Sequence, residues 1–160
     1  MKSLLLALLP FIALALGRGY TAFADKRIAE YEEYIELLGR VRGRVGSFMT
    51  PIAEVICESE CRVLSDIGFI GALREGATLS EAYRAAKQRS YASSTVKRIM
   101  TSFFQGFGHS YLDETVREID STAEELRSAV ESERVEIERS VKLARSLLML
   151  AAVGLIILLI

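Results

Sequence analysis

Two apolar segments without a charged residue lie at the ends of the chain, and nearly all of the charge lies between them. Residues 4–17 are apolar except for Pro10 and glycine, and residues 147–160 are apolar apart from glycine. A helix needs about 20 residues to cross the hydrocarbon core of a membrane, and the last segment approaches that length when it is counted from Lys142. The predicted organisation is an N-terminal transmembrane helix over 1–24, one all-α domain over 25–142 and a C-terminal transmembrane helix over 143–160.

The N-terminal segment has two interpretations. Ala22-Phe23-Ala24 after the apolar run is typical of a cleaved signal peptide, whereas a retained helix would place Arg18 at a membrane interface. We favour retention because Arg18 separates the apolar run from the proposed cleavage site. Cleavage would instead give a secreted, tail-anchored coiled-coil interaction protein.

Basic residues beside both apolar segments predict the orientation. Positive charge marks the cytoplasmic side of a membrane segment, so we expect the central domain in the cytoplasm. Cys57 and Cys61 fit that reducing compartment, since we expect them four residues apart on one helix, a poor geometry for a disulfide. The basic residues are Arg18, Lys26 and Arg27 after the first segment and Arg139, Lys142 and Arg145 before the second.

Apolar residues recur every three or four positions along the rest of the chain, which indicates amphipathic helices and no strands. A helix over 111–160 would be about 75 Å long and would continue into the membrane. The helix over 25–49 carries Gly39, Gly43 and Gly46, which a close helix–helix approach or a bend would explain. Its predicted apolar stripe is Ile28, Tyr31, Ile35, Leu38, Val41, Val45, Phe48 and Met49.

Local signals place the shorter helices. Thr50-Pro51 is typical of a helix start, Thr78 and Glu81 form a capping box, and Ser94 or Thr95 opens another helix. One helix holds Leu64, Ile67, Ile70 and Leu73 and ends at Gly76. The helix from residue 94 has an apolar face that we expect to be core, packed against the long last helix: Val96, Ile99, Met100, Phe103, Phe104 and Phe107.

Residues that carry catalysis or bind metals are sparse. His109 is the one histidine, and Cys57 and Cys61 lie among acidic residues that should raise their thiol pKa values. Two cysteines and a distant histidine do not complete a zinc site, and nucleotide-binding and hydrolase motifs are absent. A net charge of −1 argues against general nucleic-acid binding. We therefore predict no enzyme, no cofactor, no metal and no small-molecule substrate, with a thiol-redox enzyme as the remaining catalytic alternative.

Charge is segregated within the central domain. Residues 82–112 hold five basic residues and no acid, whereas residues 113–138 hold ten acids and three arginines. The two stretches either pair within the bundle or are solvated, or one of them meets a partner, since such charge steers association. The candidate partner-binding residues are Arg84, Lys87, Arg89, Lys97 and Arg98.

The chain resembles the stage III sporulation protein AB family over its whole length. The motifs that carry the resemblance are Gly19-Tyr20 through Leu38, Thr50-Pro51-Ile52, Phe69–Gly76 followed by Leu79–Ala82, and Lys142–Leu147. The chain departs from the family pattern at Arg44, Tyr111 and Thr115, where acidic, Asp and Gln residues are usual.

This resemblance implies a fold similar to the cytoplasmic domain of type II secretion platform proteins. It implies a membrane platform in the channel apparatus between mother cell and forespore. The implied partners are a cytoplasmic secretion-type ATPase and other channel membrane proteins. The implied location is the mother-cell membrane around the forespore, with the helical domain facing the cytoplasm.

Overall fold

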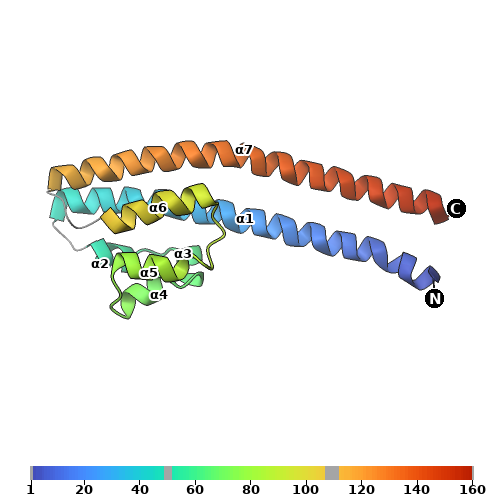
Figure 1. The fold of residues 1–160 in the computed structure, drawn as a ribbon, viewed down its shortest axis with the longest axis horizontal. Coiled ribbons are helices and arrows are strands. Elements are labelled where there is room, and N and C mark those ends of the chain that lie inside the picture. The colour runs from blue at the N-terminus through green and yellow to red at the C-terminus, as the bar shows by residue number, and fades with distance from the viewer. Residues whose placement is uncertain (1, 49–51, 107–111, 160) are drawn as a thin grey trace. The chain divides into compact units, whose positions relative to one another are not determined.

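The computed structural model describes residues 2–48, 52–106 and 112–159, and these residues form α-helices and no strands. The all-α prediction is therefore confirmed. Helices α1 and α7 are much longer than the other helices of the described residues (Figure 1). The helices are α1 (Lys2–Phe48), α2 (Ile52–Cys57), α3 (Arg62–Asp66), α4 (Phe69–Arg74), α5 (Leu79–Ala86), α6 (Ser94–Gly106) and α7 (Leu112–Leu159).

The chain divides into two compact units. The helical domain comprises Arg27–Ser132, and the terminal unit comprises Met1–Lys26 together with Glu133–Ile160. Among the residues that the structure describes, no helix has both the length and the apolar character that a membrane crossing requires. The transmembrane helices over 1–24 and 143–160 therefore stay predictions.

An aromatic cluster forms the centre of the helical domain. The Phe104 ring of α6 lies 5.1 Å from the Phe69 ring of α4 and 5.0 Å from the Tyr83 ring of α5, between centroids. Tyr34 of α1 meets Tyr83 edge-on at 6.3 Å. Such ring pairs add stabilisation beyond the apolar area that they bury. The predicted apolar face of α6 is thus core at every described position, and Phe104 packs toward α4 and α5.

The buried face of α1 differs from the predicted stripe. Tyr31, Leu38 and Val41 are buried as predicted, but Ile28 and Ile35 are only half-buried. The buried face instead includes the neighbouring positions Glu30, Tyr34 and Leu37. The face is rotated because two tyrosines and a glutamate satisfy their polar groups inside the domain, so residue polarity alone is a poor guide to its position.

The helix predicted through Leu64 and Leu73 is broken in the middle. Gly68 has φ +89°, in the left-handed region that glycine adopts most readily, and it separates α3 from α4. A second break falls between α2 and α3, where Cys57 ends one helix and Cys61 precedes the next. The expectation that the two cysteines share a helix is therefore wrong, and both are free thiols.

Side chains satisfy the first backbone N–H groups of two of the short helices, α3 and α5. The Glu33 carboxylate of α1 accepts hydrogen bonds from the backbone N–H groups of Val63 and Leu64, both at 2.8 Å. These groups lie at the start of α3, where the helix leaves its amides without intrahelical partners. The capping box of α5 is present as predicted, with Thr78 and Glu81 bonded in both directions.

Gly39 and Gly43 of α1 do not mark a close approach to another described residue. Gly39 and Gly43 are exposed, and an added Cβ at either would meet no atom within 4 Å among the described residues. Helix α1 also continues past Gly46 to Phe48. The helix–helix approach suggested from the sequence is therefore wrong for these two positions. Thr50-Pro51, Phe107, Gly108, His109 and Tyr111 lie outside the described residues.

Candidate partner-binding surface

The five candidate basic residues fall into two groups. Lys87 and Lys97 are half-buried and bonded within the domain. The Lys87 Nζ donates to Thr101 Oγ1 at 3.0 Å, and the Lys97 Nζ donates to the Ser90 carbonyl oxygen at 2.8 Å. Both lysines thus connect α6 to the end of α5 and to the loop between them, and both ammonium groups are hydrogen-bonded within the domain.

The other group consists of Arg84, Arg89 and Arg98, whose side chains are exposed. Arg98 Nη2 lies 3.8 Å from Glu125 Oε1, and with both side chains more than half exposed this ion pair contributes little. Arg84 and Arg89 make no ion pair with any described residue. These two, which we call the exposed arginine pair, are the part of the basic stretch that is open to a partner.

Arg89 lies in the loop between α5 and α6, and its guanidinium extends toward the turn between α3 and α4. A Cβ added at Gly68 would lie 3.7 Å from Arg89 Nη1. The loop therefore carries one charge of the exposed arginine pair, while α5 carries the other at Arg84.

Glu30 of α1 binds this loop through hydrogen bonds. Its role was not predicted from the sequence. The Glu30 side chain is completely buried, and it accepts hydrogen bonds from Ser90 Oγ at 2.5 Å, Tyr91 N at 2.7 Å and the Tyr34 hydroxyl at 3.0 Å. A buried carboxylate is costly unless it is satisfied in this way. The signal was present in the sequence, because Glu30, Tyr34, Leu37 and Val41 share one helical face and an acid on a core face needs partners.

Burial raises the pKa values of the two tyrosines nearest Glu30 in the core. Burial raises the pKa of Tyr34 well above its ordinary value, and repulsion from Tyr83 and Glu30 adds to the effect. Burial likewise raises the pKa of Tyr83. Both phenols thus stay neutral at physiological pH, and Tyr34 remains a hydrogen-bond donor to Glu30.

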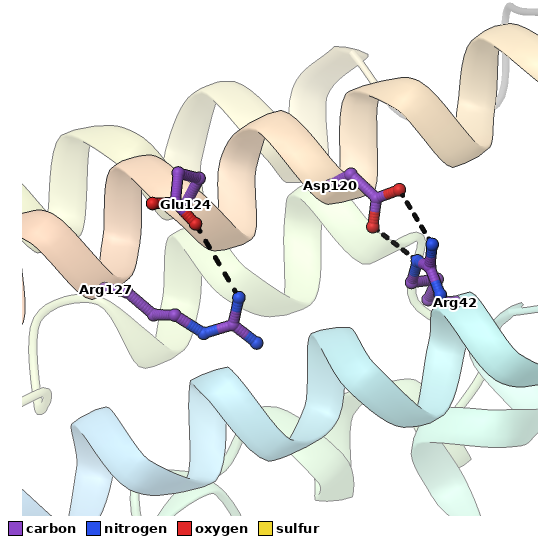
Figure 2. A network of polar contacts seen from close by, with 4 residues as sticks. All are labelled: Arg42, Asp120, Glu124 and Arg127. Atoms are coloured by element: carbon purple, nitrogen blue, oxygen red, sulfur yellow. Dashed lines mark hydrogen bonds and ion pairs between the residues drawn. The ribbon is translucent and has the colours of Figure 1, made fainter.

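The acidic stretch of α7 is partly paired within the helical domain. Figure 2 shows Arg42 of α1 reaching Asp120 of α7 through both carboxylate oxygens, and the Arg42 Nη2 to Asp120 Oδ2 distance is 3.1 Å. Glu124 Oε2 lies 3.8 Å from Nη1 of Arg127, which is one turn further along the same helix. Arg42 comes from outside the basic stretch of 82–112, so the two segregated stretches of charge meet only through Arg98 and Glu125 among the described ion pairs.

The cysteines line a surface hollow of about 560 Å³ at the break between α2 and α3. Cys61 is buried, and burial followed by repulsion from Glu33 raises the pKa of its thiol to about 11. A thiol with such a pKa is protonated at neutral pH and is a poor nucleophile. Among the described residues, no group of three or more histidine, cysteine, aspartate or glutamate side chains is placed to hold a metal ion.

These features define an all-helical protein whose short helices pack with the domain portions of two long ones, and whose loop between α5 and α6 displays arginine. The chain belongs to the stage III sporulation protein AB family, whose family model matches residues 2–160. The resemblance found in the sequence is thereby confirmed over nearly the full chain. No curated protein matches the chain. No solved structure matches it either.

Proposed function

We propose that this protein is a membrane-anchored platform that docks a cytoplasmic secretion-type ATPase in a channel apparatus between mother cell and forespore. Membership of the sporulation family supports the setting. The observation that carries the docking role is the exposed arginine pair, Arg84 and Arg89, which makes no described ion pair while the neighbouring lysines are engaged. Exposed cations of this kind attract an acidic partner and accelerate its association.

A membrane anchor is supported by where the apolar surface lies. Every large apolar side chain that is exposed among the described residues belongs to the terminal unit, and on α7 Leu143, Leu147 and Leu150 share one helical face. An exposed apolar surface of this kind marks a contact with lipid or with another protein. The full set is Tyr20, Phe23, Val135, Leu143, Leu147, Met149 and Leu150.

Docking is tested by reversing the exposed arginine pair in the full chain. Arg84→Glu with Arg89→Glu should leave the helical circular dichroism unchanged, weaken capture of the purified ATPase at low salt and impair sporulation. The matched control is Arg62→Glu with Arg117→Glu, which changes the net charge equally at two exposed arginines elsewhere in the domain. Equal capture by wild type and the arginine-pair variant would exclude docking at this surface.

Orientation is tested by cysteine labelling at Gln88, an exposed residue of the same loop. In a chain lacking Cys57 and Cys61, Gln88→Cys should react with an impermeant maleimide only after the cells are permeabilised. Labelling of intact cells would favour the second candidate, a secreted tail-anchored protein, and would place the exposed arginine pair away from any cytoplasmic ATPase. Extraction of the chain by alkaline carbonate would contradict the anchor itself.

A further inference from the structure

We propose that Glu30 of α1 is a positioning residue of the docking surface, because it fixes the loop that carries Arg89. This inference rests on the proposed docking function. It assigns to α1, a helix that contributes no residue to the exposed arginine pair, control over where one of the two arginines stands.

The first argument is how the three hydrogen bonds of Glu30 are distributed. Two of them come from adjacent residues of the loop, Ser90 through its hydroxyl and Tyr91 through its backbone N–H, and one comes from Tyr34 of α1 itself. Ser90 and Tyr91 follow Arg89 directly in the sequence. Each carboxylate oxygen takes one loop donor, so both the position and the direction of the backbone beside Arg89 are fixed.

The second argument is that further hydrogen bonds of the loop involve Ser90, the residue whose hydroxyl donates to Glu30. The Ser90 hydroxyl that donates to Glu30 accepts from the N–H of Ala92 at 3.1 Å, and the Ser90 carbonyl accepts from Lys97. One turn of loop further on, the Ser93 N–H donates to the Tyr31 hydroxyl at 3.1 Å. Glu30 and Tyr31, neighbours on α1, thus hold the middle and the C-terminal end of the segment between α5 and α6.

The third argument is that stability alone does not require a carboxylate here. A buried charge is often no more stabilising than an apolar group of the same volume. Its effect is then to fix the position of the groups that bind it. The neighbouring carboxylate Glu33 serves a different element, since it caps the start of α3. Two glutamates of α1, one turn apart, therefore hold two different segments of the chain, and only the segment held by Glu30 bears a residue of the exposed arginine pair.

The experiment compares Glu30→Gln with two matched variants in the full chain. Tyr34→Phe removes the third hydrogen bond to Glu30 but leaves both loop donors, and Glu33→Gln alters the equivalent carboxylate on the other segment. Amide hydrogen exchange at Tyr91 and capture of the purified ATPase are measured for each. Thermal unfolding of each variant provides the correction for global stability.

The proposal predicts selective effects. Glu30→Gln should speed exchange at Tyr91 by about tenfold, the effect of losing one charge-assisted hydrogen bond, and should reduce ATPase capture several-fold. Tyr34→Phe should lower the thermal midpoint without changing capture. Glu33→Gln should speed exchange at Val63 and Leu64 only, again without changing capture.

Several outcomes overturn the proposal. Unchanged exchange at Tyr91 in Glu30→Gln would show that Glu30 does not hold the loop. Faster exchange with normal capture would show that the loop position does not matter for docking. If Glu30→Gln does not fold, Ser90→Ala removes one of the two loop donors and is judged by the same two measurements. Normal capture by the Arg84 and Arg89 reversal would defeat the docking function, and the positioning role with it, while exchange at Tyr91 would still report on the loop alone.

Discussion

The ammonium group of Lys97 lies 2.8 Å from the carbonyl oxygen of Ser90, so this residue of the basic stretch connects α6 to the loop before it. Lys87 makes a comparable contact to the hydroxyl of Thr101. The stretch of five cations is thereby divided into residues that build the loop between α5 and α6 and residues that this loop and its helices display. The two groups should respond differently to substitution.

Neutralising a lysine that is hydrogen-bonded within the fold should lower the free energy of unfolding, whereas neutralising an exposed arginine should not. Lys97→Met removes a charge-assisted bond to the carbonyl oxygen of the buried Ser90, so we expect the free energy of unfolding to fall by about 1–2 kcal/mol. Arg84→Met should change it by less than about 0.5 kcal/mol, as is usual for exposed positions. Chemical denaturation of the full chain, followed by circular dichroism, measures both. Equal losses would mean that Arg84 is also held within the fold.

Truncating the centre of the aromatic cluster should be among the most damaging changes. Phe104 is 2% exposed and its ring contacts those of Phe69, Tyr83 and Phe103. Phe104→Ala should lower the free energy of unfolding by about 3–5 kcal/mol, and Phe104→Leu, which leaves a smaller void, should cost less. A loss below about 1 kcal/mol for the alanine variant would contradict the core assignment of the α6 face.

Alkaline pH should destabilise the helical domain in part through Cys61. The pKa of this thiol is raised from an ordinary value of 9.0 to about 11, so the folded state holds the proton more tightly than the unfolded chain. Its contribution is complete below pH 9 and is lost as the pH rises through 11. Cys61→Ala should therefore flatten the fall of the denaturation midpoint between pH 9 and pH 11.

The same protonation state gives an independent test with an alkylating agent. At pH 8, iodoacetamide should modify the half-exposed Cys57 and leave the buried Cys61 unmodified, as read by peptide mass spectrometry. Equal labelling of both thiols in the native chain would contradict the burial of Cys61.

Replacing the exposed glycines of α1 by alanine should stabilise the protein. Nothing among the described residues lies within 4 Å of a Cβ at Gly39 or Gly43, and alanine favours a helix over glycine by about 1 kcal/mol. Gly39→Ala should therefore raise the free energy of unfolding by up to that amount. A stabilised variant that loses ATPase capture would indicate that a partner covers this face of α1, and a destabilised variant would contradict the open space itself.

The helical character of the chain and several helix boundaries follow from local sequence patterns. Period-3.6 spacing needs only the local register of apolar residues, so the apolar face of α6 is buried as expected, and Ile119, Leu126 and Val130 of α7, which recur at similar spacing, are buried too. The α5 capping box also depends on residues three apart in the chain, Thr78 and Glu81. The family resemblance likewise rests on short local motifs.

Long-range packing sets which basic side chains are exposed and which face of α1 is buried. Glu30 reaches donors 60 and 61 residues away in the sequence, at Ser90 and Tyr91, and no local pattern encodes that pairing. The break at Gly68 likewise follows from a left-handed backbone that the apolar spacing across it does not signal. Lys87 and Lys97 carry the same charge as Arg84 and Arg89 in the sequence. Only the packing of α5 and α6 around the loop makes the lysines internal ties and leaves the arginines exposed, because a hydrogen-bond partner exists only once distant segments have met.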